Sequence, residues 1–181
     1  ALTSLKAVFY GAGGVRGFAE YCLRRGITYD PYLSGSEARE LGAEKVTLED
    51  AFALAYVVSN HMPNLPETVR ILKKRLFASM RQDATFINTG RGAQVDERDM
   101  LDTLSARPDL TALLDVTDPE PPARDSDLYT LPNVRLSAHI AGSLNDELVR
   151  MADFAIEEFV RWNSGQKLRY EVTADVLRHM A

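Results

Sequence analysis

The sequence predicts an α/β fold in which a doubly wound parallel sheet is covered by helices on both faces. Short, nearly continuous apolar segments alternate with segments of helical periodicity, which is typical of parallel sheets buried on both sides. Each apolar segment is also followed by a polar cluster. Because the carboxyl ends of parallel strands share one edge, where ligands bind, these clusters predict a single site at that edge.

The composition is that of one ordinary globular domain. Of the 181 residues, 45% are hydrophobic and 26% charged, and the formal net charge is −5. Without a basic block, a membrane-length apolar run or a recognisable signal peptide, we expect neither nucleic acid nor a membrane as partner. Cys22 is the one cysteine, which excludes an intrachain disulfide and a cysteine-based zinc site and fits a cytoplasmic protein. We expect no metal.

The first predicted strand, Lys6–Tyr10, runs directly into clustered glycines and then a helical stretch at Phe18–Arg25. Glycines let the backbone approach a pyrophosphate, and a helix N-terminus stabilises its charge, so the segment resembles a Rossmann-like dinucleotide site. A tight turn without a ligand is the alternative. The predicted cofactor contacts in this segment are Gly11, Gly13, Gly14 and Val15.

The segment departs from the dinucleotide-binding pattern in two ways. Arg16 stands where the third glycine of G-x-G-x-x-G belongs, and Gly17 follows one place late. Asp30 ends the next strand, Ile27–Tyr29, where an acid can bind a ribose 2′-hydroxyl and disfavour a 2′-phosphate. It lies closer to the glycines than the roughly 20 residues typical of the motif. The predicted first helix is therefore short, which puts cofactor affinity in question.

Short elements and a third main strand follow. The pattern predicts a helix at Ser36–Leu41 with Ser34 or Ser36 as N-cap, and then, in order, a strand at Lys45–Thr47, a helix at Leu48–Leu54 and a strand at Ala55–Asn60. The last of these runs into His61-Met-Pro63. His61 either shapes this loop or contacts a ligand, and we include His61 and Pro63 among the predicted cofactor contacts.

Pro66 opens what the periodicity predicts to be one long amphipathic helix, ETVRILKKRLFASM. Its core-facing stripe would be Val69, Leu72, Leu76 and Met80.

The fourth strand, Thr85–Asn88, ends in Thr89-Gly90-Arg91-Gly92. Flanked by glycines, the guanidinium of Arg91 can reach into a cleft and hold a carboxylate by two hydrogen bonds. A surface arginine in a turn is the alternative. Asp96 is predicted to cap a helix at Glu97–Ser105.

The last two predicted strands, Leu110–Val116 and Asn133–Ser137, are joined by a proline-rich acidic segment that contains Glu120. His139 follows the second strand. A carboxylate and an imidazole at neighbouring strand ends can form an ordered acid–base pair. The alternative is a solvated loop acid and an unrelated, hydrogen-bonded histidine.

A final helix is predicted from Ser143 to about Trp162, ended by Asn163-Ser-Gly165, and a short helical stretch at Ala174–His179 follows in the tail. Its apolar positions at helical spacing are Leu148, Met151, Phe154, Ala155 and Phe159.

Four motifs resemble the D-isomer-specific 2-hydroxyacid dehydrogenases: FINTGRGAQVDE, LLDVTDPEP, LPNVRLSAHIAGS and VVSNHMPNLPET. The resemblance extends from about Leu5 to Asn163. It implies an NAD-binding domain at residues 1–165 and hydride transfer between NAD and a small 2-keto or 2-hydroxy acid.

The same resemblance implies roles for individual residues. Arg91 would hold the substrate carboxylate and carbonyl, His139 would exchange the proton, and Glu120 would favour the imidazolium form of His139. Asp115 would contact the nicotinamide amide, with Gly14, Val15 and Asp30 on the pyrophosphate and adenosine side. The nicotinamide pocket would be lined by Thr89, Gly90, Ala141 and Gly142.

Family members carry a further substrate domain, which we expect to be absent from this chain and on which residues 166–181 would dock. The resemblance also suggests a homodimer. A nicotinamide-sensing binding module similar to the corepressors of this fold, or an inactive cofactor-domain fragment, are the alternatives to an enzyme.

Overall fold

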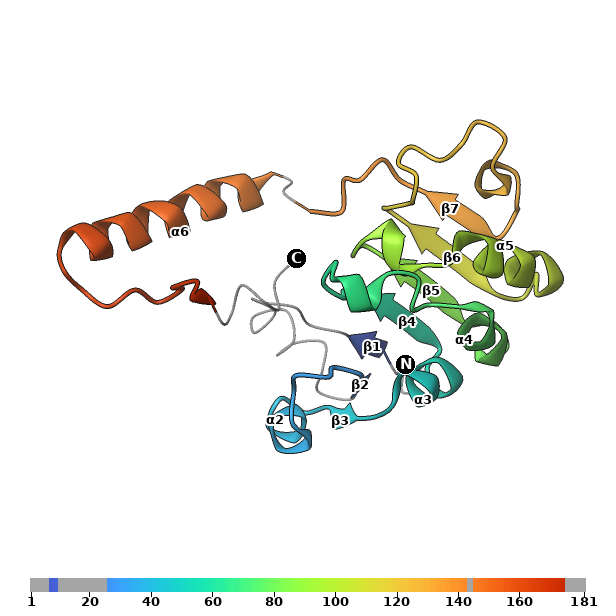
Figure 1. Cartoon of the computed structure of the whole chain (residues 1–181), viewed down its shortest axis with the longest axis horizontal. Coiled ribbons are helices and arrows are strands. Elements are labelled where there is room, and N and C mark those ends of the chain that lie inside the picture. The colour runs from blue at the N-terminus through green and yellow to red at the C-terminus, as the bar shows by residue number, and fades with distance from the viewer. Residues whose placement is uncertain (1–6, 10–25, 143–144, 175–181) are drawn as a thin grey trace.

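The computed structural model describes residues 7–9, 26–142 and 145–174, and the strands in these ranges form a seven-stranded parallel sheet (Figure 1). Its strand order is β3-β2-β1-β4-β5-β6-β7, so the order reverses between β1 and β4. This confirms the predicted Rossmann-like sheet and places its switch point beside β1. The strands are β1 (Ala7–Phe9), β2 (Ile27–Thr28), β3 (Glu44–Lys45), β4 (Val57–Asn60), β5 (Thr85–Asn88), β6 (Thr111–Leu114) and β7 (Val134–Leu136).

Three helices lie side by side along one face of the sheet: α3 (Leu48–Leu54), α4 (Lys74–Ser79) and α5 (Glu97–Ala106) (Figure 1). Between them and the sheet, Phe77 packs edge-on against Phe52 and Phe86, with ring centroids 5.7 and 5.1 Å apart. These three fully buried rings form the centre of the core.

The predicted helix starts are confirmed at two caps. Ser34, rather than Ser36, caps α2 (Gly35–Glu40), with its hydroxyl accepting from the Glu37 N–H. The Asp96 carboxylate accepts from the Asp99 N–H at the start of α5. The small strand expected at Lys45–Thr47 lies slightly earlier, as β3, because Thr47 instead caps α3.

The long helix predicted from Pro66 is wrong. The chain forms a single 3₁₀ turn, η2 (Pro66–Thr68), turns at Arg70 with φ of 50°, and becomes helical only at α4. Between η2 and α4, the Leu72 N–H donates to the Gln94 carbonyl in an isolated β-bridge. Backbone pairing with a distant segment therefore takes the place of helical hydrogen bonds in this part of the chain. Leu72, Leu76 and Met80 are buried as expected, whereas Val69 is half exposed.

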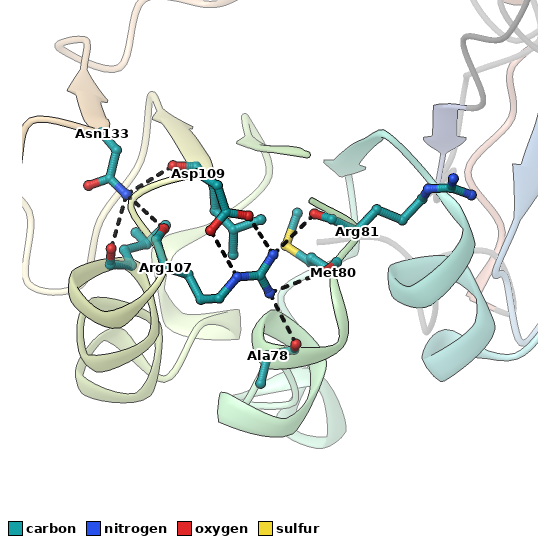
Figure 2. Close-up of polar contacts among 8 residues, drawn as sticks. Ala78, Met80, Arg81, Arg107, Asp109 and Asn133 are labelled. Atoms are coloured by element: carbon teal, nitrogen blue, oxygen red, sulfur yellow. Dashed lines mark hydrogen bonds and ion pairs between the residues drawn. The ribbon is translucent and has the colours of Figure 1, made fainter. Parts of the chain in front are cut away.

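The ends of α4 and α5 are joined by one arginine (Figure 2). The guanidinium of Arg107 donates to both carboxylate oxygens of Asp109, at 2.9 and 2.6 Å, and to the carbonyls of Ala78, Met80 and Arg81. Nearby, the Asn133 amide donates to the carbonyls of Leu104, Arg107 and Leu110. These bonds satisfy backbone carbonyls at helix ends that would otherwise need water.

The final helix, α6 (Asp146–Asn163), projects away from the sheet in Figure 1, and none of its residues is buried. It ends at Asn163, within the predicted Asn163-Ser-Gly165 stop, and Gly165 just beyond it adopts a left-handed conformation with φ of 66°. Within the described ranges, no helix is both long and apolar enough to cross a membrane. The exposed large apolar side chains of α6 are Leu148, Val149, Met151, Phe154, Ile156, Phe159, Val160 and Trp162.

Several predictions from the sequence fall on residues outside the described ranges. They are the contacts at Gly11, Gly13, Gly14 and Val15, the departure at Arg16, the helix at Phe18–Arg25, and the tail helix beyond its first residue.

Candidate functional site at the carboxyl edge of the sheet

Glu120 and His139 meet at the carboxyl ends of β6 and β7. The Nδ1 atom of His139 lies 2.7 Å from Oε1 of Glu120, and both side chains are about half exposed. The structure therefore brings together the two groups that the sequence places on neighbouring strand ends. With Nδ1 bound to the carboxylate, Nε2 is the ring nitrogen that can exchange a proton with a ligand.

His139 lies in a turn that wraps around Asp115. Its backbone is left-handed, with φ of 55°, which is uncommon for a residue with a side chain. The next two N–H groups, of Ile140 and Ala141, donate to the two Asp115 carboxylate oxygens at 2.9 Å each, and the Ser137 hydroxyl donates at 2.5 Å. Asp115 thus fixes the turn that presents the histidine.

The carboxylate of Asp115 is buried and ionised. Burial acts to raise its pKa, but the hydrogen bonds from Ser137, Ile140 and Ala141, together with nearby His139, outweigh burial and bring the pKa below its ordinary value. Oδ2 accepts one N–H from the described residues, and a carboxylate oxygen can accept two. Asp115 therefore has capacity for one more donor, such as a carboxamide.

A cavity of about 300 Å³ lies between the loops after β6 and β7. Its wall combines the ionisable side chains of Asp115, Glu120 and His139 with apolar groups, including Pro121 and Leu136. Such a lining, apolar with a few convergent polar groups, is typical of small-molecule sites.

Arg91 follows β5 and is exposed, and its Nη1 donates to the carbonyl of Gly90 at 2.8 Å. The structure therefore holds the guanidinium near its own backbone. The next residue, Gly92, packs directly on the loop after β6: a Cβ at this position would lie 2.0 Å from the Thr117 carbonyl carbon. Close backbone contact thus places the Arg91 segment beside the loop that carries Glu120.

Two further predicted residues lie towards β2 and β4. Asp30 is buried, and its Oδ1 accepts from the N–H groups of Tyr32 and Leu33 at 2.8 and 3.2 Å. His61 joins two loops, because its ring nitrogens lie 2.7 Å from the Ser59 hydroxyl and 3.3 Å from the Thr89 hydroxyl. Burial lowers the pKa of His61, which favours its neutral form.

The sequence did not point to a group of buried amides beneath these loops. Asn60, Asn88 and Gln94 are 4%, 1% and 0% exposed, and the Asn60 amide donates to the side-chain oxygens of the other two. Polar residues at the ends of apolar runs are the one signal that was available, and it does not reveal a partner 34 positions away.

The described residues fit a nicotinamide dinucleotide. The switch point beside β1 is where such ligands lie in open parallel sheets. Asp30, at the end of β2, is an acceptor for ribose hydroxyls, and Asp115 has capacity for the amide group at the other end. Ala141 and Gly142 lie in the turn after His139, and a Cβ at Gly142 would meet open space.

Comparison with known proteins agrees with this geometry. Residues 18–141 match the model of the family described as D-isomer specific 2-hydroxyacid dehydrogenase, NAD binding domain. D-3-phosphoglycerate dehydrogenase of Archaeoglobus fulgidus is 30% identical over 146 residues, which are 81% of this chain and 28% of that protein. Chloroplastic D-3-phosphoglycerate dehydrogenase 2 of Arabidopsis thaliana is 35% identical over 120 residues, 66% of this chain and 19% of that protein.

Solved structures show the same fold. The TT0316 protein of Thermus thermophilus has a TM-score of 0.74 at 31% identity, covering 95% of this chain and 55% of that one. D-mandelate dehydrogenase of Rhodotorula graminis has a TM-score of 0.78 at 23% identity, covering 94% of this chain and 51% of that one. The chain therefore spans about half the length of these structures and a smaller part of the curated relatives.

Proposed function

Because the chain belongs to the D-isomer specific 2-hydroxyacid dehydrogenases and contains their NAD-binding domain, we propose that it supports hydride transfer between NAD(H) and a D-2-hydroxy acid/2-keto acid pair. The observation that carries this proposal is the contact of 2.7 Å between Glu120 and His139 at the wall of the cavity. An imidazole that a carboxylate holds in one orientation is well suited to exchange a proton with a substrate oxygen.

Each catalytic residue has a separate role in this proposal. His139 donates a proton from Nε2 to the oxygen of the 2-keto group during reduction and removes it in the reverse direction. Glu120 orients the ring of His139 through its contact with Nδ1. Arg91 binds the substrate carboxylate and polarises the adjacent carbonyl, which requires its guanidinium to exchange the Gly90 carbonyl for the substrate.

NAD, when bound, supplies or accepts the hydride. Asp115 would accept a hydrogen bond from the nicotinamide amide and so orient the nicotinamide ring against the substrate. Asp30 favours NAD over NADP, because its buried carboxylate at the end of β2 would repel a 2′-phosphate.

The proposal is tested in the intact protein by NADH oxidation with glyoxylate or hydroxypyruvate. We expect His139→Ala to lower turnover at least about 100-fold, since it removes the general acid, while NADH titration shows binding retained. Glu120→Gln should also lower turnover. Glu157→Gln is its control, because Glu157 is likewise an exposed carboxylate paired with a basic side chain, that of Arg169, but it lies on α6.

Two results would contradict the proposed enzymatic function: full turnover by His139→Ala, or an intact wild-type protein that binds NADH but reduces no 2-keto acid. The second result would favour the nicotinamide-sensing module.

A further inference from the structure

Among the described residues, three buried amide side chains meet where the loops after β4 and β5 come together. The Nδ2 atom of Asn60 donates to Oδ1 of Asn88 at 2.9 Å and to Oε1 of Gln94 at 2.6 Å. A buried amide is costly unless it is hydrogen-bonded, and here each of the three is. The result is a closed polar network inside the fold rather than a set of solvated side chains.

Gln94 bridges the two loops with both ends of its amide. Its Oε1 accepts from Asn60 and from the Arg91 N–H at 3.3 Å. Its Nε2 donates to the carbonyls of Met62 and Pro63 at 2.6 and 2.8 Å. A single fully buried side chain thus holds the His61–Pro63 loop to the loop that carries Arg91.

The backbone on both sides of Arg91 rests on the same network. Oδ1 of Asn88 accepts from the Gly90 N–H at 3.1 Å, and Nδ2 of Asn88 donates to the Arg91 carbonyl at 3.2 Å. A Cβ at Gly90 would lie 3.1 Å from Nδ2 of Asn60 and 3.2 Å from Oε1 of Gln94. The Arg91 segment therefore packs closely on the amides.

We propose that Gln94, acting with Asn60, is a positioning pair that fixes the Arg91 segment and the His61–Pro63 loop in one arrangement before ligands bind. Groups held in place beforehand need not be ordered during binding, so cofactor and substrate affinity both benefit. The cofactor half of this inference rests on the predicted contacts of His61 and Pro63 with the cofactor. The substrate half rests on the proposed role of Arg91.

The competing explanation is that the pair only stabilises the fold. Asn133 provides the matched control, because its amide also donates to backbone carbonyls, those of Leu104, Arg107 and Leu110 at 3.0, 3.3 and 2.9 Å (Figure 2). Asn133 directly precedes β7, and its amide lies beside the end of α5, opposite the carboxyl edge of the sheet. Asn133→Leu should therefore lower stability and leave the site unchanged.

The test compares Gln94→Met, which keeps side-chain volume, with Asn133→Leu in the intact protein. Melting temperatures are recorded first, and binding is measured well below both. We expect Gln94→Met to raise the Kd for NADH and the KM for glyoxylate on the order of tenfold, since several hydrogen bonds to the two loops are lost. Equal Kd and KM in Gln94→Met, Asn133→Leu and wild type would overturn the inference.

Gln94→Glu gives a second, pH-dependent test. The buried carboxyl can donate to the Met62 or Pro63 carbonyl only when protonated, and burial raises its pKa. NADH affinity of Gln94→Glu should approach wild type at low pH and fall as pH rises, relative to wild type at each pH. A ratio independent of pH would overturn the inference. Since NADH titration needs no turnover, a protein inactive on 2-keto acids would refute the proposed function but still allow this test.

Discussion

Asp115 carries more of the site's geometry than its place in the β6 loop suggested. Its two oxygens receive a hydroxyl and two backbone N–H groups from the segment after β7. That segment includes His139, whose left-handed backbone is sparsely populated and persists only where surrounding bonds enforce it. One buried carboxylate therefore sets the position of the proposed acid–base histidine without touching its ring.

The lowered pKa of Asp115 predicts a pH-dependent contribution to stability. A carboxyl group whose pKa is lower in the folded state stabilises the protein above its unfolded pKa, about 3.9, and loses that contribution as pH falls through the folded value. At neutral pH we expect Asp115→Asn to reduce the free energy of unfolding by about 1–3 kcal/mol. Urea unfolding should show the difference from wild type shrinking below about pH 4. A difference that stays constant down to pH 2 would contradict this.

At the scale of elements, the site depends on three loops that follow neighbouring strands and contact one another. The loops after β4 and β5 are joined by buried amides, and those after β5 and β6 by backbone packing at Gly92. A parallel sheet with residue-for-residue register, such as Asn60 beside Asn88 and Asn88 beside Leu114, brings these loops to the same height. The three loops are therefore linked to one another along the sheet edge.

Gly92→Ala tests the contact between the loops after β5 and β6. The added methyl group would lie 2.0 Å from the Thr117 carbonyl carbon and 2.1 Å from its oxygen, so backbone must move. We expect a loss of about 1–3 kcal/mol in unfolding free energy by chemical denaturation. Gly35→Ala is the control, since its Cβ would meet only Arg39 at 3.7 Å. Equal stability of the two variants would show that the loops separate freely.

Sequence patterns predicted what local chemistry determines and missed what distant partners determine. Asp96 could be recognised as a cap because its partner, Asp99, lies within one turn. The segment after Pro66 has helical periodicity, yet Leu72 and Arg70 pair with backbone near Gln94, and this alternative cannot be read from local spacing. Glu120 and His139 were found because both follow apolar strands; the Asn60–Gln94 pair required the tertiary structure.

At the scale of the whole molecule, the described chain divides into a packed sheet-and-helix body and the helix α6, which lies apart from it (Figure 1). The large apolar side chains of α6 are exposed. The rings of Phe159 and Trp162 lie against each other, with centroids 6.0 Å apart. Helices gain most of their stability from packing. The stability of α6 should therefore differ from that of the body.

Amide hydrogen exchange on a protein consisting of residues 1–181 measures this difference. We expect the amides of α6 to exchange far faster than those of β5, which is paired on both sides within the sheet. Repeating the measurement at several protein concentrations is the control. Protection of α6 equal to that of β5 would contradict the expectation. Protection of α6 that rises with protein concentration would show that a second copy of the chain packs against its apolar side chains.

The central place of β1 also governs the order in which the sheet can be completed during translation. Val8 pairs with Ile27 on one side and with Val58 on the other, and both partners follow it in the chain. Each of β4, β5 and β6 pairs with the strand that emerges next from the ribosome, whereas β1 pairs both with the next strand, β2, and with the more distant β4. Because non-local pairing is slow, we expect the edge of β1 that pairs with β4 to stay unpaired until β4 has emerged.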